Sequence, residues 1–158
     1  MTLNVVVHGV PTTQGSMKAY VRGGRAIITA NNGAKLRPWR EAVRATLVDA
    51  LDGQPPMAGP VAVDLVFWLP KPASAPKRRR TWPIGARSGD LDKLARAAFD
   101  AATDAGVWVD DSQAVILSTS KDYDRNGFVG LHATFVALEV PVVGVEREAA
   151  PATGQHTA

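Results

Sequence analysis

The chain has 158 residues, 46% hydrophobic and 21% charged, a composition ordinary for one soluble globular domain with its own core. It has no cysteine, which excludes a disulfide framework, a thiolate zinc site and a cysteine nucleophile. Residues 1–89 carry 13 Lys/Arg against 4 Asp/Glu (+9), and residues 90–158 carry 5 against 11 (−6), which together give +3. This segregation indicates a polyanionic partner and a bound cation, although a merely solvated charged face explains it equally well.

The N-terminal half begins with an expected strand over residues 3–9, followed by a hairpin over residues 17–29 whose turn contains Gly23 and Gly24. An apolar period of three to four then predicts a helix from Lys35 to about Leu51. The opposite side of that helix carries a basic stripe formed by Arg37, Arg40 and Arg44.

The C-terminal half begins with alternating apolar residues that predict a strand over residues 61–69. A Pro- and Arg-rich loop follows, and its length is typical of functional or disordered segments. A helix over residues 91–105 and two closing strands come next, whereas residues 141–158 are expected to be a disordered tail. We therefore expect a single α+β domain over residues 1–140, with a mixed sheet of about five strands and two helices packed on it.

The segment "SGDLDKLARAAFDAATDAGVWVDDSQ" (residues 88–113) concentrates six aspartates. Asp90 lies at the expected N-cap of the helix and Asp92 in its first turn, and a following strand could bring Asp111 back to them. Carboxylates about 4 Å apart repel by roughly 4 kcal/mol at an effective dielectric of 20. A convergent cluster would therefore need protons or a hard cation such as Mg²⁺, and Arg96 could bind a phosphate beside it.

Plainer interpretations exist for the same residues. Asp90 and Asp92 could serve only as a cap and a favourable charge at a helix N-terminus. Asp110 and Asp111 could be turn residues before a strand, and the basic run Lys77–Arg80 could simply be solvated.

The whole pattern nevertheless resembles the signature of the RusA family of Holliday junction resolvases. "GDLDKLARAAFDAATDAGVWVDDSQAV" is similar to D-x-D-N at a helix start, a basic residue four positions after the second Asp, and G-x-[WY]-x-D-D-x-Q. The resemblance implies that Asp90, Asp92 and Asp111 bind Mg²⁺, or Mn²⁺ as a substitute, with Asp110 beside them. Arg96 stands where the family usually has lysine and is implied to contact the phosphate, and Lys93 replaces the usual asparagine.

The resemblance further implies a homodimer that acts on four-way junction DNA, often of phage or prophage origin. Candidate phosphate contacts are Arg37, Arg40, Arg44, Lys77, Arg78, Arg79 and Arg80. With no membrane-length apolar run and no secretion signal, we expect a cytoplasmic protein without a membrane partner.

The sequence thus predicts a Mg²⁺-dependent endodeoxyribonuclease that resolves Holliday junctions by paired nicks. Two alternatives remain open at this stage. One is a junction-binding protein without catalysis, and the other is a Mg²⁺-dependent nucleotide phosphotransferase or glycosyltransferase that uses D-x-D as its metal motif.

Overall fold

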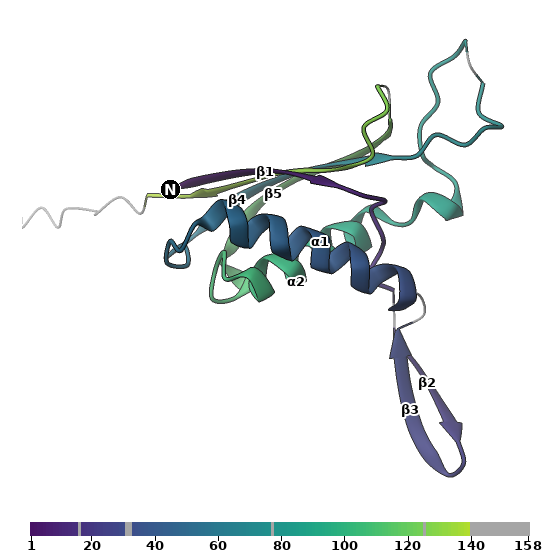
Figure 1. Cartoon of the computed structure of the whole chain (residues 1–158), viewed down its shortest axis with the longest axis horizontal. Coiled ribbons are helices and arrows are strands. Elements are labelled where there is room, and N and C mark those ends of the chain that lie inside the picture. The colour runs from purple at the N-terminus through teal and green to yellow at the C-terminus, as the bar shows by residue number, and fades with distance from the viewer. Residues whose placement is uncertain (16, 31–32, 77, 125, 140–158) are drawn as a thin grey trace, which may run out of the picture.

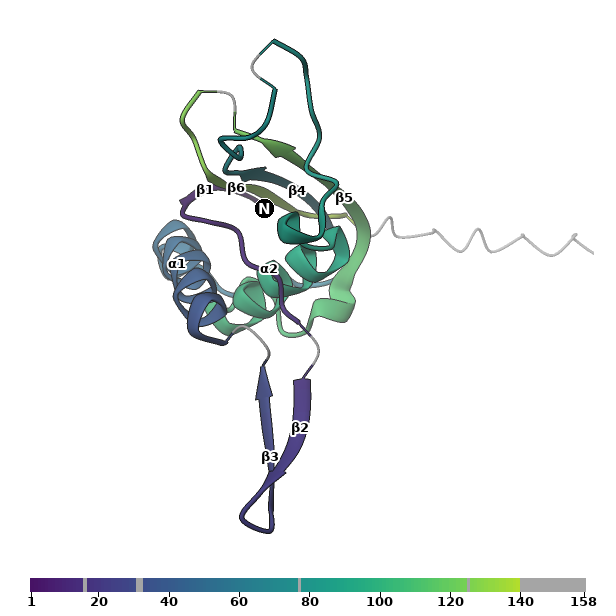
Figure 2. The ribbon, with the colours of Figure 1, turned by 90° about the vertical axis from the view of Figure 1, so that its right-hand side faces the viewer.

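The computed structural model describes residues 1–15, 17–30, 33–76, 78–124 and 126–139, and the predicted tail 141–158 lies outside them. Its main sheet has the strand order β1-β6-β4-β5, in which β4 and β5 are parallel and the other neighbours antiparallel. Both helices lie on one face of this sheet, as Figures 1 and 2 show. The bounds of these six elements are β1 Thr2–His8, α1 Gly33–Leu51, β4 Val61–Leu69, α2 Leu91–Ala105, β5 Ala114–Tyr123 and β6 Gly130–Ala137.

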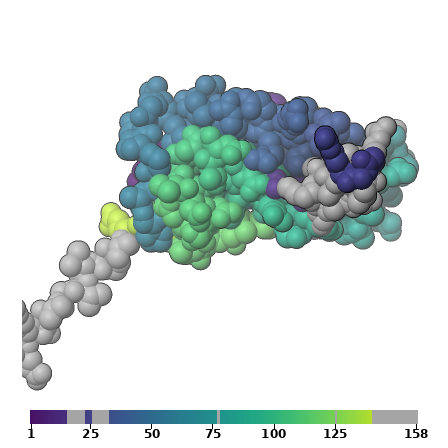
Figure 3. All heavy atoms as spheres, turned by 90° about the horizontal axis from the view of Figure 1, so that it is seen from below, coloured from purple at the N-terminus to yellow at the C-terminus, as the bar shows by residue number. Residues whose placement is uncertain are grey.

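The core lies between the sheet and the two helices. The alternation in β4 buries every second residue toward the helices, from Val61 to Leu69. The helix α1 contributes the apolar face expected from its spacing, and α2 contributes mainly alanines, which allow it to pack close to α1 and the sheet. Seen from the helix side, α1 (blue) and α2 (green) cover the domain next to each other (Figure 3).

The predicted hairpin forms a separate two-stranded sheet. Its strands, β2 (Met17–Arg22) and β3 (Arg25–Ala30), pair only with each other among the described residues. Gly23 and Gly24 both adopt positive φ, which suits the tight turn between them. Figures 1 and 2 show the hairpin projecting away from the domain. The main sheet therefore has four strands, slightly fewer than the expected five, because the hairpin does not join it.

The connection from β4 to β5 decides where the acidic residues lie. Because β4 and β5 are parallel, the chain must return along the sheet between them, and α2 makes this return. A single 3-10 turn precedes α2 (η1, Ala86–Ser88), and another precedes β5 (η2, Asp111–Gln113). The two ends of α2 consequently lie near opposite ends of β4, about 22 Å apart for a helix of 15 residues.

Candidate active site

Asp90 occupies the N-cap position of α2 but does not cap the helix. Its backbone is extended and its side chain makes no capping hydrogen bond. The carboxylate instead accepts a hydrogen bond from Lys93 Nζ at 2.5 Å. This hydrogen bond lowers the pKa of Asp90, with smaller contributions from the charges of Lys93 and Lys121. Asp90 is therefore an exposed, ionised carboxylate that makes no hydrogen bond to the N-terminal N–H groups of α2.

The backbone before Asp90 is held from two sides. Gly89 has a φ of +73°, and a Cβ there would overlap the Thr13 methyl group, so only glycine fits. The Gln14 N–H donates to the Lys93 carbonyl at 3.0 Å, and its side chain also hydrogen bonds to Asp100. The segment after β1 thus fixes the start of α2, and Asp100 serves this contact rather than the acidic site.

Lys121 on β5 is a candidate site residue that the sequence reasoning missed. Its Nζ donates to the Gly89 carbonyl at 2.5 Å and to Ser88 Oγ at 3.2 Å, directly before Asp90. The ammonium is also close enough to Asp90 to help lower the pKa of that carboxyl. This contact depends on how β5 pairs with β4, so no local pattern in the sequence could have indicated it.

Asp92 and Arg96 lie on the exposed side of α2 beyond Asp90. Asp92 helps to raise the pKa of Lys93, after the larger effect of Asp90, so the two carboxylates flank one ammonium. Within the part of the chain that the structure describes, no ion pair joins Asp92 and Arg96. The structure therefore brings Asp90, Asp92, Lys93 and Lys121 together and leaves the Arg96 guanidinium facing solvent.

Asp110 and Asp111 lie at the other end of α2. Asp110 caps η2: its carboxylate accepts from the Ser112 N–H at 2.9 Å, and Gln113 Oε1 accepts from the Asp110 N–H at 3.3 Å. The hydrogen bonds from Ser112 lower the pKa of Asp110. The amide of Gln113 then donates to the Met57 and Gly59 carbonyls, both at 2.9 Å, and so ties this turn to the start of β4.

The structure corrects the expectation that the strand after α2 returns Asp111 to Asp90 and Asp92. Asp111 is exposed beside the start of β4, whereas Lys121 and Asp90 lie near the end of that strand. Among the described residues, no group of three or more carboxylate, histidine or cysteine side chains could hold one metal ion. Within one chain, Asp111 therefore lies apart from Asp90 and Asp92.

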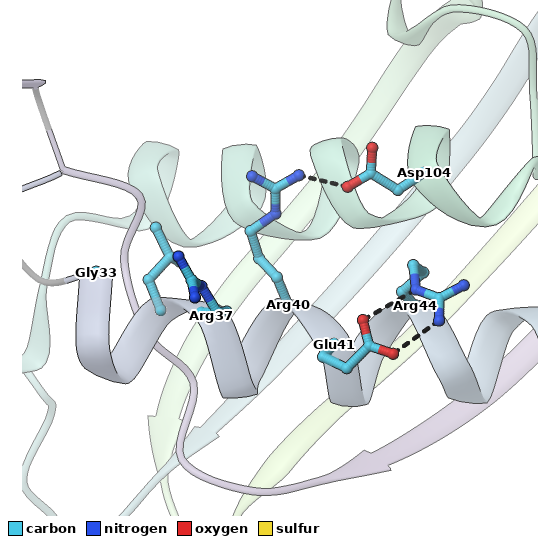
Figure 4. Close-up of a pocket in the computed structure, with 7 residues that line it drawn as sticks. Gly33, Arg37, Arg40, Glu41, Arg44 and Asp104 are labelled. Carbon is cyan, nitrogen blue, oxygen red and sulfur yellow. Dashed lines mark hydrogen bonds and ion pairs between the residues drawn. The ribbon is translucent and has the colours of Figure 1, made fainter. Parts of the chain in front are cut away.

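Two of the three arginines in the predicted basic stripe of α1 are already paired. Arg40 contacts Asp104 of α2 at 2.5 Å and Asp100 at 3.7 Å, and Arg44 contacts Glu41 at 2.7 Å. Figure 4 shows both pairs beside a shallow hollow, with Arg37 at its edge. Arg37 makes no ion pair with another described residue, so it is the arginine of this stripe most available to a phosphate.

The basic loop lies near the end of β5 that carries Lys121. Lys77 falls outside the described residues, and Arg78 and Arg79 are exposed. Arg80 pairs with Asp122 at 2.8 Å and stacks 3.8 Å over the ring of Trp82, which is itself exposed. An arginine stacked on an exposed indole is a surface suited to nucleic-acid backbone and bases.

A family model described as Endodeoxyribonuclease RusA matches residues 8–132, most of the chain. The chain belongs to the RusA family. This match confirms the resemblance seen in the sequence. The activity of this family is that of an endodeoxyribonuclease. No curated protein matches the chain significantly. None of the described helices is long and apolar enough to cross a membrane.

Proposed function

We propose that the protein is a Mg²⁺-dependent endodeoxyribonuclease that acts as a homodimer and resolves four-way DNA junctions by paired nicks. The observation that carries this proposal is the pair Asp90 and Asp92 in a RusA-family chain: both are exposed, and neither side chain is used to cap α2. Paired cuts in opposed strands need two active sites in one assembly, which a two-fold dimer provides.

The donor set fits a hard divalent cation. Asp90 and Asp92 would hold Mg²⁺ or Mn²⁺, because both ions prefer carboxylate oxygens. When bound, such an ion would supply an activated water and would neutralise charge that develops on the phosphate. Lys93 must release Asp90 for this, and a solvent-exposed ion pair is weak enough to be exchanged for a divalent cation.

Asp111 completes this carboxylate set from a second copy of the chain. A helix of 15 residues lies between it and Asp90 within one chain, so one chain cannot bring them together without unfolding α2. Asp110 remains in its capping box and is therefore a structural residue of the Asp111 turn. Each dimer would then contain two sites, each built from both chains.

The chain's cations bind and orient the DNA around this site. Arg96 is exposed one turn beyond Asp92, where its planar guanidinium can donate two hydrogen bonds to a phosphate. Arg37, Arg78 and Arg79 form no ion pair with another described residue and add free positive charge, whereas Arg40, Arg44 and Arg80 must first leave their carboxylate partners. Binding of this kind is strongly salt-dependent and mostly independent of base sequence.

Cleavage of a synthetic four-way junction tests the activity. The wild type should place paired nicks in the junction with Mg²⁺, and should cut neither the junction in EDTA nor a linear duplex of the same arms. Asp92→Asn should bind the junction without cutting it, while Asp49→Asn, an exposed aspartate of α1, should cut normally. Equal cutting of linear duplex, or a fully active Asp92→Asn protein, would show that this function is wrong.

Mixed dimers test the origin of Asp111. Asp92→Asn and Asp111→Asn should each be inactive, but dimers made by co-expressing them should regain nicking in one strand, because one of their two sites is intact. Co-expression of Asp90→Asn with Asp92→Asn is the matched control and should restore nothing, since both changes lie in the same half of the site. If the first mixture also stays inactive, the three carboxylates are not shared in this way.

A further inference from the structure

A cavity of about 550 Å³ lies beside the segment that precedes Asp90. Its walls come from the ends of β4 and β5 and from the loop after β4, and include Leu69, Ser74, Ala86, Ser88 and Tyr123. Most of its lining surface is apolar, and its volume is in the range of small-molecule sites, about 300–1,000 Å³. The Ser88 hydroxyl accepts a hydrogen bond from Lys121 Nζ at 3.2 Å, so the cavity wall is directly connected to the candidate active site.

The cavity lies where sheets with parallel strands usually bind ligands. β4, α2 and β5 form a β-α-β unit, and Leu69 and Tyr123 are the last residues of its two parallel strands. In open sheets built from such units, ligands bind beyond the carboxyl ends of the strands. The loop after β4, drawn in teal, extends beyond this end of the sheet (Figure 1). This position indicates a binding site rather than a gap in the packing.

A second hollow, of about 330 Å³, shares Tyr123 with the cavity and is charged. The charged side chains along it include Arg78, Arg79, Arg80, Asp122 and Asp124. Arg80 pairs with Asp122 at 2.8 Å, whereas the two other arginines form no ion pair with another described residue. The Thr81 hydroxyl oxygen, also in this lining, is buried and makes no hydrogen bond to a described residue. Two arginines and a hydroxyl group are therefore available to a phosphate.

One nucleotide matches this pair of hollows, because its base has apolar faces and its phosphate is an anion. A base inside a duplex is stacked and paired, so only a base turned out of the helix can enter a cavity. We propose that the cavity binds one such base of the DNA strand, stacked on Tyr123, while Arg78, Arg79 and Thr81 bind a phosphate of the same strand. This inference rests on the proposed function, since the strand is the one whose phosphate reaches Asp90.

Binding of short single strands tests the base cavity without any cutting. A fluorescent strand of about eight thymidylates, titrated in EDTA, is compared with the same sugar–phosphate chain without bases. The wild type should bind the complete strand about ten-fold more tightly, the effect of one base stacked on an aromatic ring. Tyr123→Leu should lose this preference, because leucine keeps the bulk but not the ring, whereas Tyr123→Phe should keep it. Equal binding of the two strands by the wild type would overturn the inference.

Filling the cavity tests the same site without changing Tyr123. Ser74→Leu extends an exposed residue of the cavity wall and should abolish the preference for bases. Ala73→Leu, at the exposed neighbouring position outside the lining, is the matched control and should keep the preference. Circular dichroism checks that both variants fold. A Ser74→Leu protein that still prefers the complete strand would place the base elsewhere and would make the assignment wrong.

Thymidine monophosphate identifies the source of the nucleotide. It should displace the strand only at a much higher concentration, because it lacks the neighbouring phosphates that add to binding. Displacement at an equal concentration would make the cavity a site for free nucleotides and would contradict its assignment to DNA. Junction cutting is measured separately, so cutting without a preference for bases, or the preference without cutting, shows which of the two proposals fails.

Discussion

The two ends of α2 carry carboxylates in similar local settings and use them differently. At the N-terminal end, Asp90 occupies the cap position, but its carboxylate pairs with Lys93 and leaves the helix uncapped. Beyond the C-terminal end, Asp110 accepts the hydrogen bond that a cap residue accepts, and Gln113 completes the capping box. The position of an aspartate before a helical turn therefore does not reveal its role. What distinguishes the two aspartates is whether the carboxylate accepts a hydrogen bond from a backbone N–H group.

The largest effect on junction cleavage is expected from removing the carboxylate of Asp90, which accepts no hydrogen bond from the helix backbone. Asp90→Ala should lower the rate of junction cleavage by more than about 100-fold, because even outer partners of metal ligands commonly account for 10–100-fold. Its melting temperature should change little, since Asp90 makes no cap hydrogen bond and its ion pair is exposed. Single-turnover cleavage and thermal unfolding measure the two quantities. Normal cleavage combined with a lower melting temperature would reverse the roles assigned to Asp90 and Asp110.

The second largest effect on junction cleavage is expected from Lys121, whose ammonium holds the backbone directly before Asp90. Lys121→Met keeps the aliphatic stem but removes the ammonium that holds the Gly89 carbonyl, so Asp90 loses its fixed position. We expect about a ten-fold slower cleavage at saturating Mg²⁺, in the range found for groups that orient metal ligands. Lys121→Arg should recover most of the rate, whereas Asp110→Ala should not lower it. A loss of rate explained entirely by a lower folded fraction in thermal unfolding would show that Lys121 acts only on stability.

Most of the structure at the N-terminal end of α2, where Asp90 lies, could be predicted from the sequence. The apolar period predicted α2 over the residues that it occupies, and its buried face includes Leu94, Ala98 and Ala101 as expected. The RusA signature was confirmed by the family match, and the single α+β domain with two helices on a sheet was confirmed by the fold. These features are local, since they depend on periodicity and spacing within about thirty residues.

The relation between the two ends could not be predicted in the same way. Whether Asp111 returns to Asp90 depends on the direction in which β5 pairs with β4, and this is settled by packing across the domain. The β-α-β order did carry a signal, because a helix between adjacent parallel strands must separate the residues at its two ends. The role of Asp110 as a cap also had a signal in the sequence, because Asp followed three positions later by Gln is the spacing of a capping box. The contact between Lys121 and Gly89 joins residues 32 apart and had no local signal.

Asp110, which caps η2 beyond the C-terminal end of α2, should respond in stability rather than in chemistry. Asp110→Ala removes the hydrogen bond to the Ser112 N–H, and loss of a helix cap should lower the melting temperature by about 2–4 °C in a domain of this size. Asp110→Asn keeps an acceptor and should restore most of the loss, which makes it the matched control. Both proteins should still cut the junction once folded. Abolished cleavage in the folded Asp110→Asn protein would instead make Asp110 a site carboxylate.

The smallest effect is expected at Lys93, the residue by which this chain departs from the usual family pattern. Its ammonium occupies Asp90 and raises the positive charge where a divalent cation would bind, so Lys93→Asn should tighten Mg²⁺ binding by about two-fold. The measurement is the Mg²⁺ concentration that gives half-maximal junction cleavage, at low ionic strength, where exposed charges are least screened. Lys71→Asn removes an exposed lysine of the loop and should leave that concentration unchanged. Weaker Mg²⁺ binding in Lys93→Asn would mean that the lysine organises Asp90 for the metal rather than competing with it.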